Sequence, residues 1–362
     1  MFMLKRICFF SGDITRGGGT ERLATRIMNA LVQDGSYQVS VLNICMAHKQ
    51  IFPLDSKIYK HALSEHWIDV GPGYFKIYPL LISYLKEQHV DILVDIDNVL
   101  DILSIPAARI CGIKVISWDN FSYDFASSIW YRPLIRQLSV RFADQIVVLG
   151  NHDKEAYLQN FNMEKKPVVI CNPVPDPNPS IRKNFNEKII VSAGRLVKLK
   201  GFASIPQIVS ILKKKNRDLK FRWLIAGQGE EKEKIEEEIR KYDTPEVELC
   251  GFISNMSAFY QKGLVFVLTS STEGLPMVVL EALSNGLPCL SYPISGELNE
   301  VLHDGENGYF VDNNEEMAER LLQLLTDENL YQNMHQKALQ IPQEYTMPYV
   351  IQQWKELFES LK

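Results

Sequence analysis

The chain has 362 residues, which is too long for one ordinary hydrophobic core and suits two domains. Hydrophobic side chains make up 46% of the sequence and charged side chains 23%, proportions close to the averages of globular proteins. The formal charge of -5 excludes a general electrostatic attraction to nucleic acid.

Cysteine spacing and apolar run lengths predict the cellular compartment. The six cysteines are widely separated and form no C-x-x-C pair, which favours buried reduced thiols over disulfides or metal ligands. Lys5 and Arg6 precede only four apolar residues, too few for a signal peptide, and no apolar run reaches the roughly 18 residues of a membrane span. We therefore expect a cytoplasmic protein.

Short apolar runs alternate with longer amphipathic stretches along the whole chain. This rhythm predicts βαβ units and parallel sheets, because parallel strands need a crossover segment between them. Helical patterns in the first half include Glu21–Gln33 and Tyr74–Gln88. The strands predicted there are Arg6–Ser11, Gln38–Ile44, Ile92–Ile96, Lys114–Ser117, Gln145–Leu149 and Val168–Cys171.

Three consecutive glycines, Gly17 to Gly19, lie between the first predicted strand and the first predicted helix. Glycine lets the backbone approach a ligand closely, but a flexible turn would use the same residues. The spacing also differs from G-x-G-x-x-G, so the loop does not indicate an NAD-binding domain.

A proline-rich segment separates the two halves of the chain. Asn172–Pro179 contains four prolines in eight residues, which predicts an extended and semi-rigid connector. We place a first domain at 1–172, a linker at 173–179 and a second domain at 180–345. The terminal segment 346–362 contains one further predicted helix, Tyr349–Leu361.

The second half repeats the alternation of strands and helices, and its first strand ends in a loop with two cations. Gly194 ends that strand, and Arg195 and Lys200 follow it at the edge where parallel sheets bind ligands. Both cations suit phosphate, although two solvated surface cations would give the same pattern. The strands predicted there are Ile189–Ala193, Phe221–Ala226, Val247–Cys250, Leu264–Leu268 and Pro288–Ser291.

A polar turn and a short helix follow the strand Leu264–Leu268. Pro276 stands where a helix begins and Gly286 where it ends. The free backbone N–H groups of Gly274, Leu275 and Met277 would then form an anion cradle at the helix start.

Glu273 lies in this turn and Glu281 in the helix, eight residues apart. Eight helical residues span about 12 Å, more than the roughly 5–9.5 Å that separates the paired carboxyls of glycoside hydrolases. We interpret the two side chains as separate acceptors for hydroxyl groups. The alternative for Glu281 is a solvated helix face, but its neighbours are apolar.

These motifs together resemble glycosyltransferase family 4, whose members are retaining enzymes of the GT-B fold. The resemblance covers nearly the whole chain, and in the first half it rests on Gly18–Arg22. It implies two Rossmann-like α/β domains with parallel sheets facing a deep cleft, and a final helix that packs back onto the first domain. In the second half it rests on Gly194–Arg195, Lys200–Gly201, Ala226–Gly229, Gly251–Phe252, Glu273–Met277 with Glu281, and Asp304–Gly308.

The resemblance also implies a role for each matching residue. Arg195 and Lys200 would neutralise the departing diphosphate of a nucleotide-sugar donor, so that no metal ion or other cofactor is needed. Glu281 would bind the ribose and Glu273 the transferred sugar. The other implied donor contacts are Gly18 and Gly19 over the diphosphate, Gly251, Phe252 and Ile253 beside the base, and Gly274, Leu275, Pro276 and Met277 around the sugar and β-phosphate. Gly194 and Gly227 are also implied as donor-binding residues.

The chain departs from many relatives in one segment of the first domain. They carry a histidine after the fourth strand, near the reacting sugar, whereas this chain reads Ser117–Tyr123 without one. Either Asp119 or Asn120 would take the contact with the sugar, and the alternative is that both only form a turn.

Two further motifs allow more than one interpretation. Asp95 and Asp97 match a D-x-D metal motif, but that motif belongs to a different glycosyltransferase fold, so we favour a structural or acceptor-side role. The segment Ile129–Arg141 mixes apolar residues with three arginines. It suits peripheral contact with an anionic membrane, but we favour an ordinary packed helix with a solvated face.

The predicted reaction is retaining, metal-independent transfer from a UDP-sugar to a saccharide or lipid-linked glycan in the synthesis of capsule, lipopolysaccharide or a related surface glycan. The predicted partners are this donor and this acceptor, with no nucleic acid. One alternative is a UDP-sugar 2-epimerase on the same fold, which the histidine-poor loops disfavour. Another is an inactive nucleotide-sugar-binding protein.

Overall fold

The computed structural model describes residues 4–66, 68, 73–121, 123, 127, 129–175, 184–273, 276–294 and 298–361. The chain divides into two compact units. Unit 1 comprises Met1–Pro173 with Met347–Lys362, and unit 2 comprises Val174–Thr346. Of the predicted linker, residues 176–179 lie outside the described part of the chain.

Unit 1 contains a sheet of seven strands in the order β3-β2-β1-β4-β5-β6-β7, and every pairing is parallel. The order reverses between β1 and β4, which is the topological switch point of a doubly wound fold. The strands are β1 (Lys5–Ser11), β2 (Tyr37–Asn43), β3 (Tyr59–Ala62), β4 (Ile92–Asp95), β5 (Lys114–Trp118), β6 (Gln145–Val148) and β7 (Val168–Val169).

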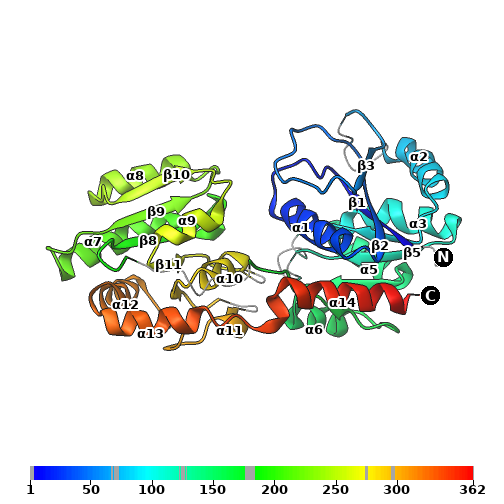
Figure 1. Cartoon of the computed structure of the whole chain (residues 1–362). Helices are drawn as coiled ribbons and strands as arrows, with labels where there is room; N and C mark the ends of the chain where they lie inside the picture. The colour runs from blue at the N-terminus through cyan, green and yellow to red at the C-terminus, as the bar shows by residue number, and fades with distance from the viewer. Residues whose placement is uncertain are drawn as a thin grey trace. The chain divides into compact units, whose positions relative to one another are not determined.

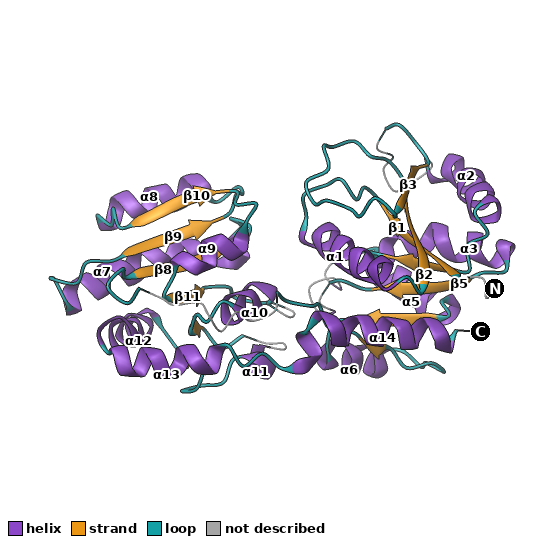
Figure 2. Cartoon of the chain, in the orientation of Figure 1, coloured by secondary structure: helices purple, strands orange, loops and turns teal. Residues whose placement is uncertain are grey.

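Helices cover both faces of this sheet (Figure 2). Alternate residues of β1 face opposite sides: Ile7 and Phe9 join the core with α1 and α14, whereas Cys8 and Phe10 join the core with α2 and α3. The helices of unit 1 are α1 (Gly19–Asp34), α2 (Tyr74–Glu87), α3 (Asp101–Cys111), α5 (Arg132–Phe142), α6 (Asn151–Asn160) and α14 (Met347–Ser360).

The C-terminal helix α14 lies beside α1, so both ends of the chain belong to unit 1 (Figure 1). Trp354 is fully buried and meets Trp118 of β5 edge to face, with ring centroids 5.1 Å apart. Lys5 forms an ion pair of 3.0 Å with Glu359. The last helix therefore packs against a sheet whose strands all lie in the first half of the sequence.

Unit 2 contains a second parallel sheet, with the order β10-β9-β8-β11-β12-β13 and a switch point between β8 and β11. One face packs against α7, α8, α12 and α13. Against the other face lies α10, which contacts β11, β12 and α9. The strands are β8 (Ile189–Ala193), β9 (Arg222–Ala226), β10 (Val247–Gly251), β11 (Val265–Leu268), β12 (Cys289–Ser291) and β13 (Gly308–Phe310).

The helices of unit 2 are α7 (Ile205–Lys215), α8 (Lys232–Tyr242), α9 (Met256–Lys262), α10 (Met277–Ser284), α11 (Leu298–Val301), α12 (Asn314–Thr326) and α13 (Glu328–Ala338). In neither unit do the described residues include a helix long and apolar enough to cross a bilayer. The predicted parallel α/β architecture is confirmed in both halves of the chain.

Two edge strands, β3 and β13, were not predicted from the sequence. All four residues of β3 are exposed or half-buried, and two of the three residues of β13 are half-buried. Short edge strands therefore lack the continuous apolar run that marks the central parallel strands.

Candidate functional site

The loops after β8 and β11 lie next to each other at the switch point of unit 2. The hydroxyl of Thr269 donates to the carbonyl oxygen of Lys200 at 2.7 Å, and the amide of Ser271 donates to the carbonyl oxygen of Leu199 at 2.9 Å. These bonds tie together the two segments in which the sequence predicts donor-binding residues. Ligands of doubly wound sheets bind at such a switch point.

Glycines join the remaining loops of this edge through backbone contacts. The amide of Gly194 donates to Ala226 O at 3.0 Å, and the amide of Gly227 donates to Gly251 O at 2.8 Å. A Cβ atom at Gly227 would lie 1.9 Å from Gly194 O, so a side chain there would separate the two loops. The next residues after β10 are Phe252, which is 52% exposed, and Ile253, which is half-buried.

Lys200 and Glu273 are in direct contact, because the Lys200 ammonium group donates to the Glu273 carboxylate. The Ser270 hydroxyl donates to the same carboxylate oxygen at 2.7 Å. Arg195 is exposed and has no side-chain partner among the residues described. The structure thus brings together two predicted site residues, while Arg195 projects into solvent from the same loop.

Glu281 lies on α10 and is 4% exposed. Its carboxylate accepts a hydrogen bond of 3.1 Å from the Tyr260 hydroxyl of α9. The solvated helix face that was the alternative for Glu281 is therefore wrong, since α10 packs this residue against its neighbours.

The helix that follows Glu273 starts one residue later than predicted. Pro276 precedes α10, which begins at Met277, and Gly286 follows it with a left-handed φ of 72°. Gly274 and Leu275 lie outside the described residues, so the anion cradle at this helix start stays a prediction.

The glycine loop of unit 1 already has a carboxylate beside it. Glu21, in the first turn of α1, is 2% exposed and accepts from Arg16 Nε at 2.9 Å. A Cβ atom at Gly18 would lie 2.2 Å from a Glu21 oxygen, whereas Gly19 has open space beside it. Glu21 supplies the negative charge that the start of a helix favours. The contact of Gly18 and Gly19 with a diphosphate stays a prediction.

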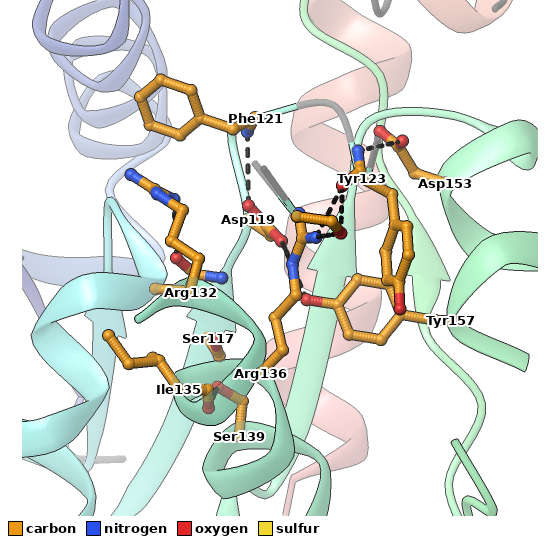
Figure 3. Close-up of polar contacts among 12 residues, drawn as sticks. Ser117, Asp119, Phe121, Tyr123, Arg132, Ile135, Arg136, Ser139, Asp153 and Tyr157 are labelled. Carbon is orange, nitrogen blue, oxygen red and sulfur yellow. Dashed lines mark hydrogen bonds and ion pairs between the residues drawn. The ribbon is translucent and has the colours of Figure 1, made fainter. Parts of the chain in front are cut away.

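Asp119 lies in a buried polar cluster after β5 (Figure 3). One of its oxygens accepts from Arg136 Nε and from the Tyr157 hydroxyl, both at 2.8 Å. The Asp119 and Arg136 side chains are each 1% exposed. The Arg136 guanidinium also lies over the Tyr123 ring, 4.3 Å from its centroid, and donates to the Tyr123 carbonyl.

Asn120 makes a similar connection between loops. Its side-chain amide donates to Ile96 O, directly after β4, at 2.9 Å. In this structure Asp119 and Asn120 hold the segment after β5 in place, which suits a positioning role. A direct contact of either residue with a sugar stays a prediction.

Asp95 and Asp97 are held by different partners. Asp95 is fully buried and accepts from the Ser104 hydroxyl, and burial raises its pKa well above the usual range. Asp97 accepts from Arg132 at 3.1 Å. No cluster of three or more metal-ligating side chains occurs within the described residues. These contacts agree with a structural role for the pair.

Helix α5 places its arginines on the opposite side from the one expected for a solvated basic face. Arg132 and Arg136 are 4% and 1% exposed, whereas Trp130 and Leu134 are 82% and 63% exposed. The reason is the pairing of the two arginines with Asp97 and Asp119. Of the three arginines only Arg141 is exposed. The prediction that the arginines lie on a solvated face is therefore wrong for Arg132 and Arg136.

Sequence reasoning also missed a histidine–carboxylate pair at the carboxyl edge of unit 1. His48 Nδ1 lies 2.8 Å from an Asp13 oxygen. The two residues are 35 positions apart, and no local motif links them. The one available signal was that both follow neighbouring predicted strands.

Comparison with known proteins identifies the family. The model "Glycosyl transferases group 1" matches residues 177–340, and "Glycosyltransferase Family 4" matches residues 17–176. An uncharacterized glycosyltransferase of Haemophilus influenzae is 31% identical over 97% of this chain and 99% of its own length. The chain belongs to the family 4 glycosyltransferases. Membership of this family confirms the prediction that the protein is a transferase enzyme.

A second relative of the glycosyltransferase comes from Campylobacter jejuni. It is an alpha-1,4-N-acetyl-D-galactosaminyltransferase named for an acceptor linked to PP-undecaprenol. It is 26% identical over 95% of this chain and 96% of its own length.

The fold of the glycosyltransferase is shared with solved GT-B structures. Anabaena Alr3699/HepE, crystallised with UDP and glucose, superposes with a TM-score of 0.74 at 17% identity. The match covers 98% of this chain and 99% of that one. The predicted GT-B fold, with two α/β domains, is thereby confirmed.

Proposed function

We propose that this glycosyltransferase moves a hexose or N-acetylhexosamine from a UDP-sugar to a saccharide or lipid-linked glycan. The transfer would retain the anomeric configuration, need no metal ion or other cofactor, and serve surface polysaccharide synthesis in the cytoplasm. The observation that carries the proposal is the contact between Lys200 and Glu273 at the switch point of unit 2.

The proposed chemistry follows from the charges at this edge. Breaking the anomeric C–O bond builds negative charge on the leaving phosphate, which Lys200 and the exposed Arg195 would stabilise. These two cations would supply the stabilisation that a divalent metal gives elsewhere. Glu273 would accept hydrogen bonds from hydroxyl groups of the transferred sugar, because an ionised carboxylate only accepts.

The choice of UDP and of a lipid-linked acceptor is supported by similar proteins. The Anabaena structure contains UDP and glucose, and the Campylobacter jejuni relative is named for an acceptor on PP-undecaprenol.

The exposed side chains of Trp130, Leu134 and Arg141 in unit 1 would suit peripheral contact with an anionic membrane. Flotation with phosphatidylglycerol vesicles, compared between the wild type and Trp130→Ser, tests that contact.

A donor panel tests the reaction. UDP-, GDP- and ADP-sugars are incubated with the enzyme, with and without EDTA, and products are followed by mass spectrometry. We expect slow hydrolysis or transfer with a UDP-sugar only, unchanged by EDTA, and a product whose anomeric configuration by NMR matches the donor. Loss of activity in EDTA that manganese restores would contradict the metal-independent mechanism.

Two other results would indicate the alternative functions. Conversion of UDP-N-acetylglucosamine into the manno sugar without an acceptor would indicate an epimerase. Tight UDP binding without hydrolysis or transfer of any donor would indicate a nucleotide-sugar-binding protein.

The ribose contact has a separate test. Glu281→Gln keeps the size of the side chain and the hydrogen bond from Tyr260. It removes the negative charge that would strengthen hydrogen bonds from the ribose hydroxyls. We expect UDP to bind on the order of tenfold more weakly by calorimetry. Equal affinity would refute the ribose role.

A further inference from the structure

His48 and Asp13 lie at the carboxyl edge of the unit 1 sheet, and neither is among the residues that the family resemblance or the proposed donor site names. Asp13 follows β1, His48 follows β2, and these two strands pair in parallel. The His48 ring nitrogen Nδ1 lies 2.8 Å from Asp13 Oδ2. Doubly wound sheets bind ligands outside this edge.

Asp13 fixes the backbone of His48 as well as its ring. The His48 amide donates to the Thr15 hydroxyl oxygen at 3.1 Å, and that hydroxyl donates to Asp13. The amides of Thr15 and Ala47 also donate to Asp13, at 2.8 and 3.2 Å. The two loops are thus joined through one carboxylate that is 1% exposed.

The protonation of Asp13 determines the tautomer of His48. Burial alone would raise the pKa of Asp13, but hydrogen bonds from Thr15, His48 and Ala47 together hold it below the usual value. An ionised carboxylate only accepts hydrogen bonds, so the proton of a neutral His48 ring lies on Nδ1. Nε2 then carries a lone pair, on a side chain that is 60% exposed.

We infer that His48 Nε2 accepts a hydrogen bond from a hydroxyl group of a saccharide bound at this edge of unit 1. The ligand must donate a hydrogen bond, which a nucleotide phosphate at neutral pH does not, and the Asp13 charge behind the ring disfavours an anion. Saccharide hydroxyls are the matching donors. The inference rests on the proposed function for its ligand class, and the hydroxyl belongs either to the acceptor or to the donor sugar.

Two replacements of His48 separate a ligand contact from a structural role. The side-chain amide of His48→Asn can occupy the Nδ1 position and keep the bond to Asp13, but nothing replaces Nε2. His48→Gln instead places an amide near the Nε2 position. His89→Asn is the matched control, because His89 is exposed and lies before the start of β4, at the opposite edge of the sheet.

Kinetics identify which sugar makes the contact. Transfer is measured from UDP-glucose, UDP-galactose and their N-acetylamino analogues to the methyl glycosides of glucose, galactose and N-acetylgalactosamine. We expect His48→Asn to lower kcat/KM on the order of tenfold, with His48→Gln between it and the wild type and His89→Asn unchanged. A raised acceptor KM assigns the hydroxyl to the acceptor, and a raised donor KM assigns it to the donor sugar. Unchanged kinetics, or His48→Gln as the more damaging replacement, would overturn the inference.

NMR of ¹⁵N-histidine-labelled protein tests the same group without turnover. The His48 signal, assigned by its loss in His48→Asn, should show the Nδ1–H tautomer, and its Nε2 shift should change when a UDP-sugar or a methyl glycoside is added. An Nε2–H tautomer, or an Nε2 shift that neither a UDP-sugar nor a methyl glycoside changes, would overturn the inference. Because this measurement needs no sugar transfer, a negative result here contradicts the role of His48. A negative donor panel would instead contradict the proposed transferase function.

Discussion

Lys200 donates a hydrogen bond to Glu273, so the cation expected at the leaving phosphate lies against the carboxylate expected at the transferred sugar. The two side chains are 22% and 13% exposed, so water screens the pair only in part. A nucleotide-sugar would bring a phosphate to one member of the pair and hydroxyl groups to the other. The pair therefore holds both groups in place before the donor binds.

Replacement of Lys200 tests this arrangement. We expect Lys200→Ala to lower kcat/KM for the donor by about 2–4 kcal/mol, because a cation beside the leaving phosphate is lost. Lys198→Ala is the matched control, since Lys198 lies in the same short turn with an exposed side chain. Equal effects of the two replacements in steady-state kinetics would remove Lys200 from the site.

Gly201 allows the loops after β8 and β11 to approach each other closely at the donor edge of unit 2. Its φ is +66°, and a Cβ atom there would lie 2.2 Å from Thr269 O. Gly305 has a φ of +75°, and a Cβ atom there would have no neighbour within 4 Å. Gly305→Ala therefore adds only the cost of the left-handed backbone, roughly 1–2 kcal/mol. Gly201→Ala should cost more in urea unfolding and also weaken UDP binding. If Gly201→Ala and Gly305→Ala lowered the free energy of unfolding equally, and UDP affinity were unchanged, the close contact between the loops after β8 and β11 would not be needed.

The buried pair of Asp119 and Arg136 should stabilise unit 1 only as a pair. Arg136→Met leaves the buried Asp119 carboxylate without its cation, with hydrogen bonds from the Tyr157 hydroxyl and the Phe121 amide, and we expect a loss of about 3–5 kcal/mol. The double replacement with Asp119→Leu should cost less than the sum of the two single replacements. Urea unfolding of the four proteins measures this coupling. Strict additivity would mean that the two charges do not interact.

Asp153 should make stability depend on pH. Burial is the main cause that raises its pKa to about 6, from an ordinary value of 3.8. The folded state therefore binds a proton more tightly than the unfolded state, and stability falls as the pH rises from about 4 to about 6. Above that range, Asp153→Asn should be more stable than the wild type, by on the order of 1–3 kcal/mol, because the neutral amide keeps the oxygen that accepts from the Tyr123 amide.

Thermal melting at pH 4 and pH 7.5 checks this sign. The advantage of Asp153→Asn should appear at pH 7.5 and be absent at pH 4. Asp218→Asn, at an exposed position in unit 2, should melt like the wild type at both values. A stabilisation of Asp153→Asn that is equal at both values would mean that the charge is not responsible.

Features of the site that depend on local sequence could be predicted. Gly194 directly follows β8, and Glu281 lies among apolar residues on a short helix after β11. In each case the relevant signal spans fewer than about ten residues, as the periodicity of strands and helices does. The boundaries of the central strands differ from those predicted by only one or two residues for the same reason.

Contacts between distant segments could not be predicted. The pattern of α5 indicated that Arg132 and Arg136 were exposed, because periodicity shows which residues share a helix face but not what covers that face. The carboxylates that bury these arginines follow β4 and β5, 35 and 17 residues earlier in the chain.

The sequence by itself determined two parallel α/β halves and the loops that follow their strands, because these depend on apolar periodicity and on glycine and proline at element ends. Only the tertiary structure decided the partners: Lys200 with Glu273, Asp119 with Arg136, and His48 with Asp13. Parallel strands bring loops from separate βα units to one edge of a sheet. Which side chains meet there depends on strand order and register, and neither is encoded in any single segment.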